Sequence, residues 1–371
     1  MDFSLSETQE ELVGLARTIL TDHAELPRLK ATEQSEAGFD RDCWQAFADA
    51  NLLGIAIPEA NGGLGLGFLD LCLVLREAGK HVVPMPLLSC LVTAALPCAR
   101  FGTDEQRAYL APVVRGEFIG TAALIEYGSD ADDPHVVATP DGDGWRLDGV
   151  KTTVPFADIA GAILVSARVA GTDDIVMLNV AAAADGMSLV RQQGQNYEHL
   201  FEVTFSNTPA GRDGQIGTQA EGRAILEWTL ARTLVAQCAI VGGVCDAAMR
   251  ITAQYTIDRK QFDRQIGTFQ AVSQRMADAY INNQAIELTM LAAATHLDEG
   301  LEVPEEVATA KYWACEGGNQ IAHTALHIHG GISIDLDYPI HRHFLWIKQS
   351  EFTYGAATPT LRRLGALIAS S

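Results

Sequence analysis

Residues 259–271 read Arg-Lys-Gln-Phe-Asp-Arg-Gln-Ile-Gly-Thr-Phe-Gln-Ala, and they separate two long stretches whose composition is typical of helices. The helical stretches 224–257, 269–297 and 304–327 are longer than a usual globular helix, and short connections join them. Long helices with short connections favour a four-helix bundle. The C-terminal part of the chain, residues 216–371, is therefore predicted to be a helical bundle.

The chain before this bundle has two different patterns. Residues 1–117 carry apolar residues at helical spacing, interrupted by a glycine-rich break at 58–65, so we predict a helical domain. From residue 118 short runs rich in β-branched residues alternate with turn signals, for example Asp-Gly-Asp-Gly at 141–144 between two such runs. Residues 118–215 are therefore predicted to form an antiparallel β domain.

Composition limits the class of protein. The chain has 371 residues and a formal net charge of −21, which argues against nucleic-acid and anionic membrane partners. The seven cysteines form no Cys-x-x-Cys pair, which suits a reducing compartment. The first residues lack the pattern of a signal peptide, and the longest uncharged run, 82–99, contains three prolines. We expect a cytoplasmic protein that does not span a membrane.

Several short motifs occur in a fixed order along the chain. Residues 53–59 read Leu-Gly-Ile-Ala-Ile-Pro-Glu, residues 62–65 read Gly-Gly-Leu-Gly, and residues 101–106 read Phe-Gly-Thr-Asp-Glu-Gln. With the segment 259–271 and a later glycine pair, their order and spacing resemble the acyl-CoA dehydrogenase family over essentially the whole chain. The resemblance implies an α+β fold with an N-terminal helical domain (1–117), a middle β domain (118–215) and a C-terminal four-helix bundle (216–371). It also implies FAD-dependent α,β-desaturation of an acyl-CoA thioester.

The resemblance assigns cofactor contacts to the segment 259–270, which in this family reaches across a dimer interface to the neighbour's flavin. Arg259 would meet the FAD pyrophosphate, because a guanidinium pairs well with phosphate. Glycines at 330 and 331 would allow the backbone to approach the adenosine closely, and His327 stands where the family often has glutamine. The residues implied to contact FAD are Arg259, Gln261, Phe262, Ile266, Phe269, Gln270, His327, Gly330 and Gly331. The alternative reading is a helix end followed by a loop with ordinary core aromatic residues.

The loops that would hold the flavin ring depart from the family pattern. Residues 124–130 read Leu-Ile-Glu-Tyr-Gly-Ser-Asp, and Ile125 replaces a threonine whose hydroxyl would contact the ring. Residues 151–156 read Lys-Thr-Thr-Val-Pro-Phe, and Pro155 occupies another expected threonine. Proline has no N–H to donate. The half of the cofactor site nearest the chemistry is therefore expected to be damaged.

The catalytic base of the family is also missing. A glutamate removes the α proton in this family, and a carboxylate suits that task because a dry pocket can raise its pKa. At the family's first position this chain has Tyr354 or Gly355, and at the second it has Thr233 or Ala231. The nearest acids, Glu351 and Glu227, are expected to lie on solvated faces. We expect no catalytic residue in this chain and, from histidines at 323, 327, 341 and 343 without paired carboxylates, no metal site.

This combination resembles the non-catalytic subunit of heteromeric actinobacterial acyl-CoA dehydrogenases, which are associated with CoA thioesters of steroid side chains. The resemblance implies an unlike dehydrogenase subunit as partner in an α2β2 assembly, an acyl-CoA substrate, and an electron-transfer flavoprotein or similar acceptor. One alternative is a self-sufficient homotetrameric dehydrogenase with a displaced base. Another is a scaffold subunit that binds no flavin.

Overall fold

The computed structural model describes residues 3–370, which divide into two compact units. Unit 1 comprises residues 1–30, 68–83 and 234–371, apart from the undescribed ends, and unit 2 comprises residues 31–67 and 84–233. The division into domains 1–117, 118–215 and 216–371 stays a prediction.

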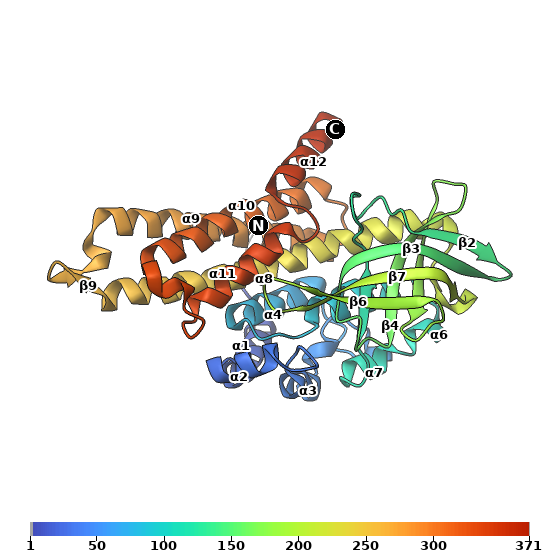
Figure 1. The fold of residues 1–371 in the computed structure, drawn as a ribbon, viewed down its shortest axis with the longest axis horizontal. Helices are drawn as coiled ribbons and strands as arrows, with labels where there is room; N and C mark the ends of the chain where they lie inside the picture. The colour runs from blue at the N-terminus through green and yellow to red at the C-terminus, as the bar shows by residue number, and fades with distance from the viewer. Residues whose placement is uncertain (1–2, 371) are drawn as a thin grey trace. The chain divides into compact units, whose positions relative to one another are not determined.

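Unit 1 consists mainly of helices, and the three long C-terminal helices expected from the sequence are present (Figure 1). Helix α8 begins in unit 2 and continues into unit 1, and α2 crosses the boundary at residue 30. Helix α10 packs against α9, α11 and α12. The elements are α1 (Glu7–His23), α2 (Leu26–Glu33), α4 (Phe68–His81), α8 (Gly222–Asp258), β9 (Lys260–Gln261), β10 (Arg264–Gln265), η6 (Ile266–Thr268), α9 (Gln270–Asp298), α10 (Pro304–His329), η7 (Gly330–Ile334), α11 (Ile340–Phe352) and α12 (Ala357–Ser370).

Helices α4 and α8 approach each other at two glycines. A Cβ atom on Gly79 would lie 2.2 Å from the carbonyl oxygen of Ile240, and one on Gly243 would lie 1.9 Å from the carbonyl oxygen of Arg76. No side chain fits at such distances. Glycine at these positions therefore fixes how closely the two helices pack.

A buried carboxylate joins α4 to α1. The Glu77 side chain is 2% exposed, and its Oε1 lies 2.8 Å from Nε of Arg17. Its Oε2 lies 2.7 Å from Nζ of Lys80, and Nε2 of His81 lies 3.6 Å from Oε1. Burial alone raises the pKa of Glu77, but hydrogen bonds from His81, Arg17 and Lys80 outweigh that effect and hold its pKa well below the ordinary value.

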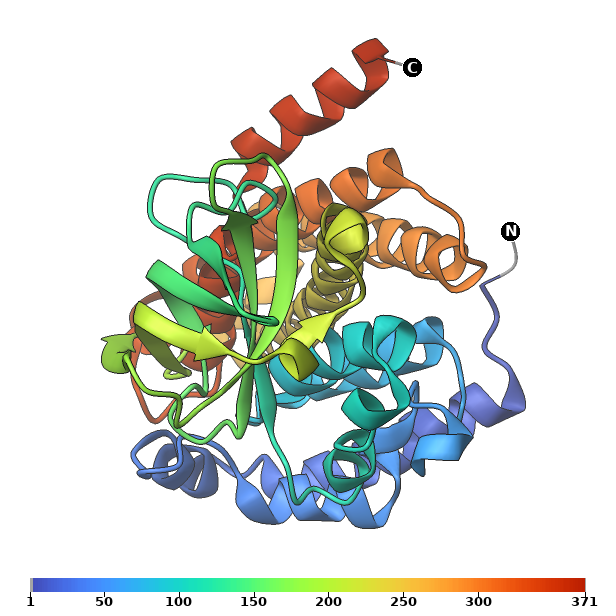
Figure 2. The ribbon, with the colours of Figure 1, turned by 90° about the vertical axis from the view of Figure 1, so that its right-hand side faces the viewer.

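Unit 2 is built on an eight-stranded sheet with the order β6-β7-β3-β2-β4-β5-β8, and β1 pairs with β4 (Figure 2). Most pairs are antiparallel, as expected, including the β2–β3 hairpin around Gly142. The pairs β1–β4 and β2–β4 are parallel, so the sheet is mixed. The strands are β1 (Gly120–Ala123), β2 (Val137–Asp141), β3 (Gly144–Pro155), β4 (Ala162–Val169), β5 (Ile175–Ala181), β6 (Met187–Gln193), β7 (His199–Ala210) and β8 (Gln215–Ile216).

Short helical segments complete unit 2. The apolar segment η3 has π-helical geometry where the sequence predicted a helix, and it packs against β1. Thr103 caps α6 through its hydroxyl, as its position before Asp-Glu-Gln predicted. The remaining elements are α3 (Arg41–Asp49), η1 (Leu52–Gly54), η2 (Glu59–Asn61), η3 (Leu87–Ala95), α5 (Leu96–Phe101), α6 (Asp104–Arg107), α7 (Leu110–Val114), η4 (Arg212–Gly214) and η5 (Gln219–Glu221).

All seven cysteines are free and buried. Burial raises the pKa of Cys90 and of Cys238 to about 12 and that of Cys98 to about 11. The thiols therefore behave as small core side chains. The segment Gln219–Asp258 has the length and hydropathy of a membrane-spanning helix, but 72% of its most apolar window is buried inside the protein, as in a core helix.

Candidate functional site

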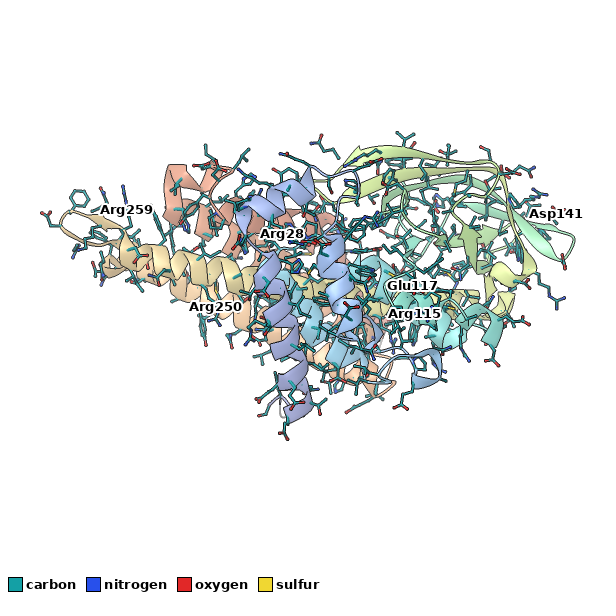
Figure 3. The ribbon with its side chains drawn as sticks, turned by 90° about the horizontal axis from the view of Figure 1, so that it is seen from below. Arg28, Arg115, Glu117, Asp141, Arg250 and Arg259 are labelled. Carbon is teal, nitrogen blue, oxygen red and sulfur yellow. The ribbon has the colours of Figure 1, made fainter. Side chains whose placement is uncertain are left out.

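The segment 259–265 forms a two-stranded hairpin between α8 and α9. Gln261 pairs with Arg264, and Lys260 pairs with Gln265. The hairpin lies beyond the ends of the two helices that it joins (Figure 1), and Arg259 is at its base (Figure 3). The sequence places this segment where both long helices end, so it projects into solvent.

The predicted cofactor residues of the hairpin are accessible. Arg259, Gln261, Phe262 and Gln270 are exposed, whereas Ile266 and Phe269 are half-buried. Phe262 is 87% exposed, and its ring meets the ring of Phe269 edge to face. The guanidinium of Arg264 lies over the other partner of this pair, 4.0 Å from the Phe269 ring centroid. The result is an aromatic and cationic surface available to a ligand or a partner.

The second predicted cofactor segment lies at the end of α10. Gly330 has φ +64° and ψ −142°, a conformation that suits glycine, and Cβ atoms at Gly330 and Gly331 would meet nothing within 4 Å. His327 is exposed. The backbone of this corner is therefore open to close approach.

Three aromatic residues that the sequence analysis did not assign connect this corner to the end of α8. The His329 ring is 4% exposed and stacks on Tyr255, with ring centroids 4.4 Å apart, and it also meets Tyr338. Tyr255 lies one helical turn before Arg259, so both predicted cofactor segments adjoin the same end of unit 1. Only the pairing of aromatic residues near 255 and 329 could have signalled this contact.

The imidazole of His329 acts as a structural group. Its Nδ1 lies 2.9 Å from the carbonyl oxygen of Ala325, which fixes the proton on Nδ1. Burial lowers the pKa of His329, although the bond to Ala325 opposes that effect. A neutral ring therefore supports the Gly330–Gly331 corner.

In unit 2, the loop that would hold a flavin ring is tied to the sheet by a buried ion pair. Nζ of Lys151 lies 2.6 Å from Oε1 of Glu126 and 3.0 Å from the hydroxyl of Ser166. The same carboxylate accepts the backbone N–H groups of His135 and Val136. Burial lowers the pKa of Lys151 to about 8, against the opposing charge of Glu126. Both loop departures thus surround a well-ordered core pair.

The polar groups on the outer side of this loop already have partners. Oε1 of Gln192 accepts the Thr153 N–H at 2.9 Å, and Gln192 also bonds the hydroxyl of Thr152. Nε2 of Gln192 donates to the hydroxyl of Tyr127, which donates to Glu202. Strand β3 is irregular here, because its register with β7 shifts between Lys151 and Val154. The donors nearest the expected ring position are therefore used within the chain.

The turn at the family's usual base position contains no acid. Tyr354 and Gly355 both have positive φ, of 59° and 107°. The turn is held by Lys311, a 2% exposed side chain whose Nζ donates to Gln237 Oε1 at 2.8 Å and to the carbonyl oxygens of Ser350 and Thr353. A buried cation at the end of a helix stabilises the carbonyl groups there.

The other candidate positions for a base are occupied as the sequence predicted. Thr233 is buried and donates to the carbonyl oxygen of Thr229, and Glu227 is exposed. Glu351 forms an ion pair with Lys348. His343 is buried with Nδ1 at 3.0 Å from the carbonyl oxygen of Pro339. In the described part of the chain no three metal-ligating side chains gather at one place.

Comparisons with known proteins identify the class. The model "Acyl-CoA dehydrogenase, N-terminal domain" matches residues 6–117, and "Acyl-CoA dehydrogenase, C-terminal domain" matches residues 220–366. Together they cover more than half of the chain. This chain belongs to the acyl-CoA dehydrogenase family, whose members are oxidoreductases.

Individual relatives narrow the likeness. The acyl-CoA dehydrogenase FadE27 of Mycobacterium tuberculosis is 36% identical over 383 residues, covering 100% of both chains. A solved structure titled as a variant of the Tcur3481-Tcur3483 steroid ACAD is 44% identical, with a TM-score of 0.94 and 99% of each chain covered. The ChsE4-ChsE5 complex from Mycobacterium tuberculosis is 35% identical, with a TM-score of 0.94 and 100% of each chain covered.

FAD is the cofactor of this family, and the residues of this chain fit one part of it. The exposed cations of the hairpin and the open Gly330–Gly331 backbone suit a phosphate-linked adenosine. The loop around Thr152 and Thr153 does not suit a flavin ring, since Gln192 occupies its donors. The structure therefore offers contacts for the dinucleotide half of FAD and lacks free donors for the ring.

Proposed function

We propose that this chain is the non-catalytic subunit of a heteromeric FAD-dependent acyl-CoA dehydrogenase. It contributes the reach-across contacts to FAD and the partner interface, while an unlike subunit supplies the base. The observation that carries this proposal is the contrast between the two halves of the cofactor site. The hairpin with Arg259 is exposed and unpaired, whereas the ring loop is closed by Gln192.

The base position supports the same division of roles. The turn at Tyr354 and Gly355 keeps an ordered shape through Lys311, although it contains no carboxylate. A tyrosine hydroxyl near its ordinary pKa of about 10 is a poor base at neutral pH. FAD, when bound, accepts the β hydride, and the α proton then needs an acceptor from another chain.

Exposed apolar side chains on unit 1 support a large interface. Tyr280, Ile281 and Leu288 lie on the outer face of α9, and Leu361 and Ile368 lie on α12. Each is between 49% and 62% exposed. Such surfaces on a helical unit are typical of protein–protein interfaces. We therefore propose an α2β2 assembly with an unlike acyl-CoA dehydrogenase chain.

The substrate and the acceptor follow from the relatives. Because the 44% identical structure is titled a steroid ACAD, we propose a CoA thioester of a steroid side chain as substrate. We propose an electron-transfer flavoprotein or a similar protein as the acceptor and the cytoplasm as the location.

Coexpression with an unlike dehydrogenase chain from the same source tests the proposal. The expected product is a heterotetramer with one FAD per pair of unlike chains, measured by flavin absorbance after gel filtration. This chain alone is expected to be poorly soluble or flavin-free. A flavin-replete homotetramer with normal turnover would refute the proposal and favour the self-sufficient alternative. A complex that binds its partner but no flavin would favour the scaffold alternative.

Anaerobic bleaching of the flavin by an acyl-CoA substrate locates the base. The variants Tyr354→Phe, Glu351→Gln and Glu227→Gln in this chain are expected to bleach as the wild type does. Replacing the partner's glutamate is expected to slow bleaching by about 10²–10⁴-fold, the usual contribution of a general base. If Glu351→Gln or Glu227→Gln stops bleaching while FAD remains bound, this chain carries its own displaced base.

A further inference from the structure

The turn at the tip of the hairpin is built from unfavourable residues. Strands β9 and β10 leave a two-residue loop, Phe262 and Asp263, with φ of +52° and +59°. Two consecutive residues with positive φ are the pattern of a type I′ turn, for which Asn-Gly is the preferred sequence. A bulky aromatic residue rarely adopts this conformation, whereas aspartate tolerates it. The folded chain gains little in return, because Phe262 is 87% exposed.

The charges at the tip have an unusual distribution. Within residues 259–264, Arg259, Lys260 and Arg264 are basic and Asp263 is the single acid. None of these four side chains forms an ion pair with another residue between 3 and 370, in a chain whose net charge is −21. The carboxylate of Asp263 thus stands unpaired beside three cations that bind nothing within the chain.

A cationic tip suits an anion on a neighbouring molecule, and an acid at its end opposes that attraction. The carboxylate becomes favourable only when the neighbour presents a cation next to its anion. Under the proposed function, the anion is the FAD pyrophosphate, and the neighbour is the chain that holds the flavin ring. Asp263 would then face a protein group beside the cofactor.

We infer that Asp263 selects the partner: it pairs with a lysine or arginine of the unlike subunit, beside the phosphates that Arg259 binds. This inference rests on the proposed function. A second copy of this chain would offer the wrong charge, because residues 126–135 of its ring loop contain Glu126, Asp130, Asp132 and Asp133 but no lysine or arginine. Like charges at an interface suppress the wrong pairing. Asp263 therefore favours the unlike partner over a second copy.

Three variants separate the charge of Asp263 from its backbone conformation. Asp263→Asn removes the charge but keeps a residue that tolerates positive φ, Asp263→Gly removes the charge and relaxes the turn, and Asp263→Lys reverses the charge. Because the side chain is exposed, all three are expected to fold, which thermal melts check. The affinity of each for the purified unlike chain is measured at 50 mM and at 500 mM salt.

Asp263→Asn and Asp263→Gly are expected to weaken association by a similar factor, about 5-fold at low salt, and the loss should shrink at high salt. Asp263→Lys should weaken it further and should self-associate more than the wild type in sedimentation runs. Wild-type affinity for Asp263→Asn at both salt concentrations would overturn the inference. A loss confined to Asp263→Gly would also overturn it, since the cause would be the backbone. If the wild type pairs with no unlike chain, the proposed function fails first and the inference fails with it.

Discussion

Replacing Glu77 by glutamine removes a buried charge that three cations share. Arg17 and Lys80 contact its two oxygens at 2.8 Å and 2.7 Å, and Lys80 and His81 are themselves largely buried. Removing one member of a buried ion pair costs about 3–5 kcal/mol, because the remaining charges stay desolvated. For a domain of this size, 1 kcal/mol shifts Tm by roughly 2–4 °C, so Glu77→Gln is expected to lower the Tm of unit 1 by about 6–20 °C.

The effect should depend on pH with a definite sign. The folded-state pKa of Glu77 is well below the ordinary value of 4.5, so its stabilising contribution is fully present above that value. The contribution is lost as pH falls through the folded-state pKa. The difference in Tm between wild type and Glu77→Gln should therefore be constant from pH 7 to about 5 and should shrink on further acidification.

Differential scanning calorimetry measures both results. The control is Glu117→Gln, whose carboxylate pairs with Arg115 on the surface, where both side chains are more than half exposed (Figure 3). Solvent screens such a pair, so this variant should melt as the wild type does. An equal Tm for Glu77→Gln and wild type, or a difference that grows on acidification, would refute the reasoning.

Three further variants test other parts of the molecule. Arg259→Ala should weaken FAD retention by the complex by about 10–100-fold, from the loss of one charge-assisted contact; Arg250→Ala, whose guanidinium pairs with Asp246 (Figure 3), should retain FAD, and equal retention by both variants would remove Arg259 from the site. Gly79→Ala should destabilise unit 1, since its Cβ would meet the Ile240 carbonyl oxygen at 2.2 Å, whereas Gly14→Ala in α1 should stabilise it by about 0.5–1 kcal/mol in denaturant titrations. Lys151→Met should lower the stability of unit 2 by about 3–5 kcal/mol in the same assay, because Glu126 would lose its buried partner.

The sequence predicted the element types well where periodicity is strong. The long apolar stretches became α8, α9 and α10 with ends within about two residues of the expected ones, and the Asp-Gly-Asp-Gly turn joined β2 and β3. The parallel pairing of β1 and β2 with β4 could not be predicted, because alternation of apolar residues does not encode which strands are neighbours. The π-helical geometry of η3 also left no mark on the pattern.

For the site, motif order predicted which residues would be exposed at the end of the bundle. It did not predict the stack of Tyr255 on His329, because that contact joins residues 74 positions apart. Nor did it predict that Gln192 would bind Thr152 and Thr153, since a single glutamine on a strand carries no signal for its partner across the sheet. The roles of the predicted cofactor residues stay predictions until the flavin content of their variants is measured.

The seven buried thiols make the chain a record of its own opening. Cys43, Cys90 and Cys98 belong to unit 2, whereas Cys72, Cys238, Cys245 and Cys315 belong to unit 1. An alkylating reagent reaches none of them at the folded surface, so each modification marks a moment when the surrounding core has opened. Peptide mapping after brief exposure would then reveal which unit opens first and how fast, with no added label and no mutation.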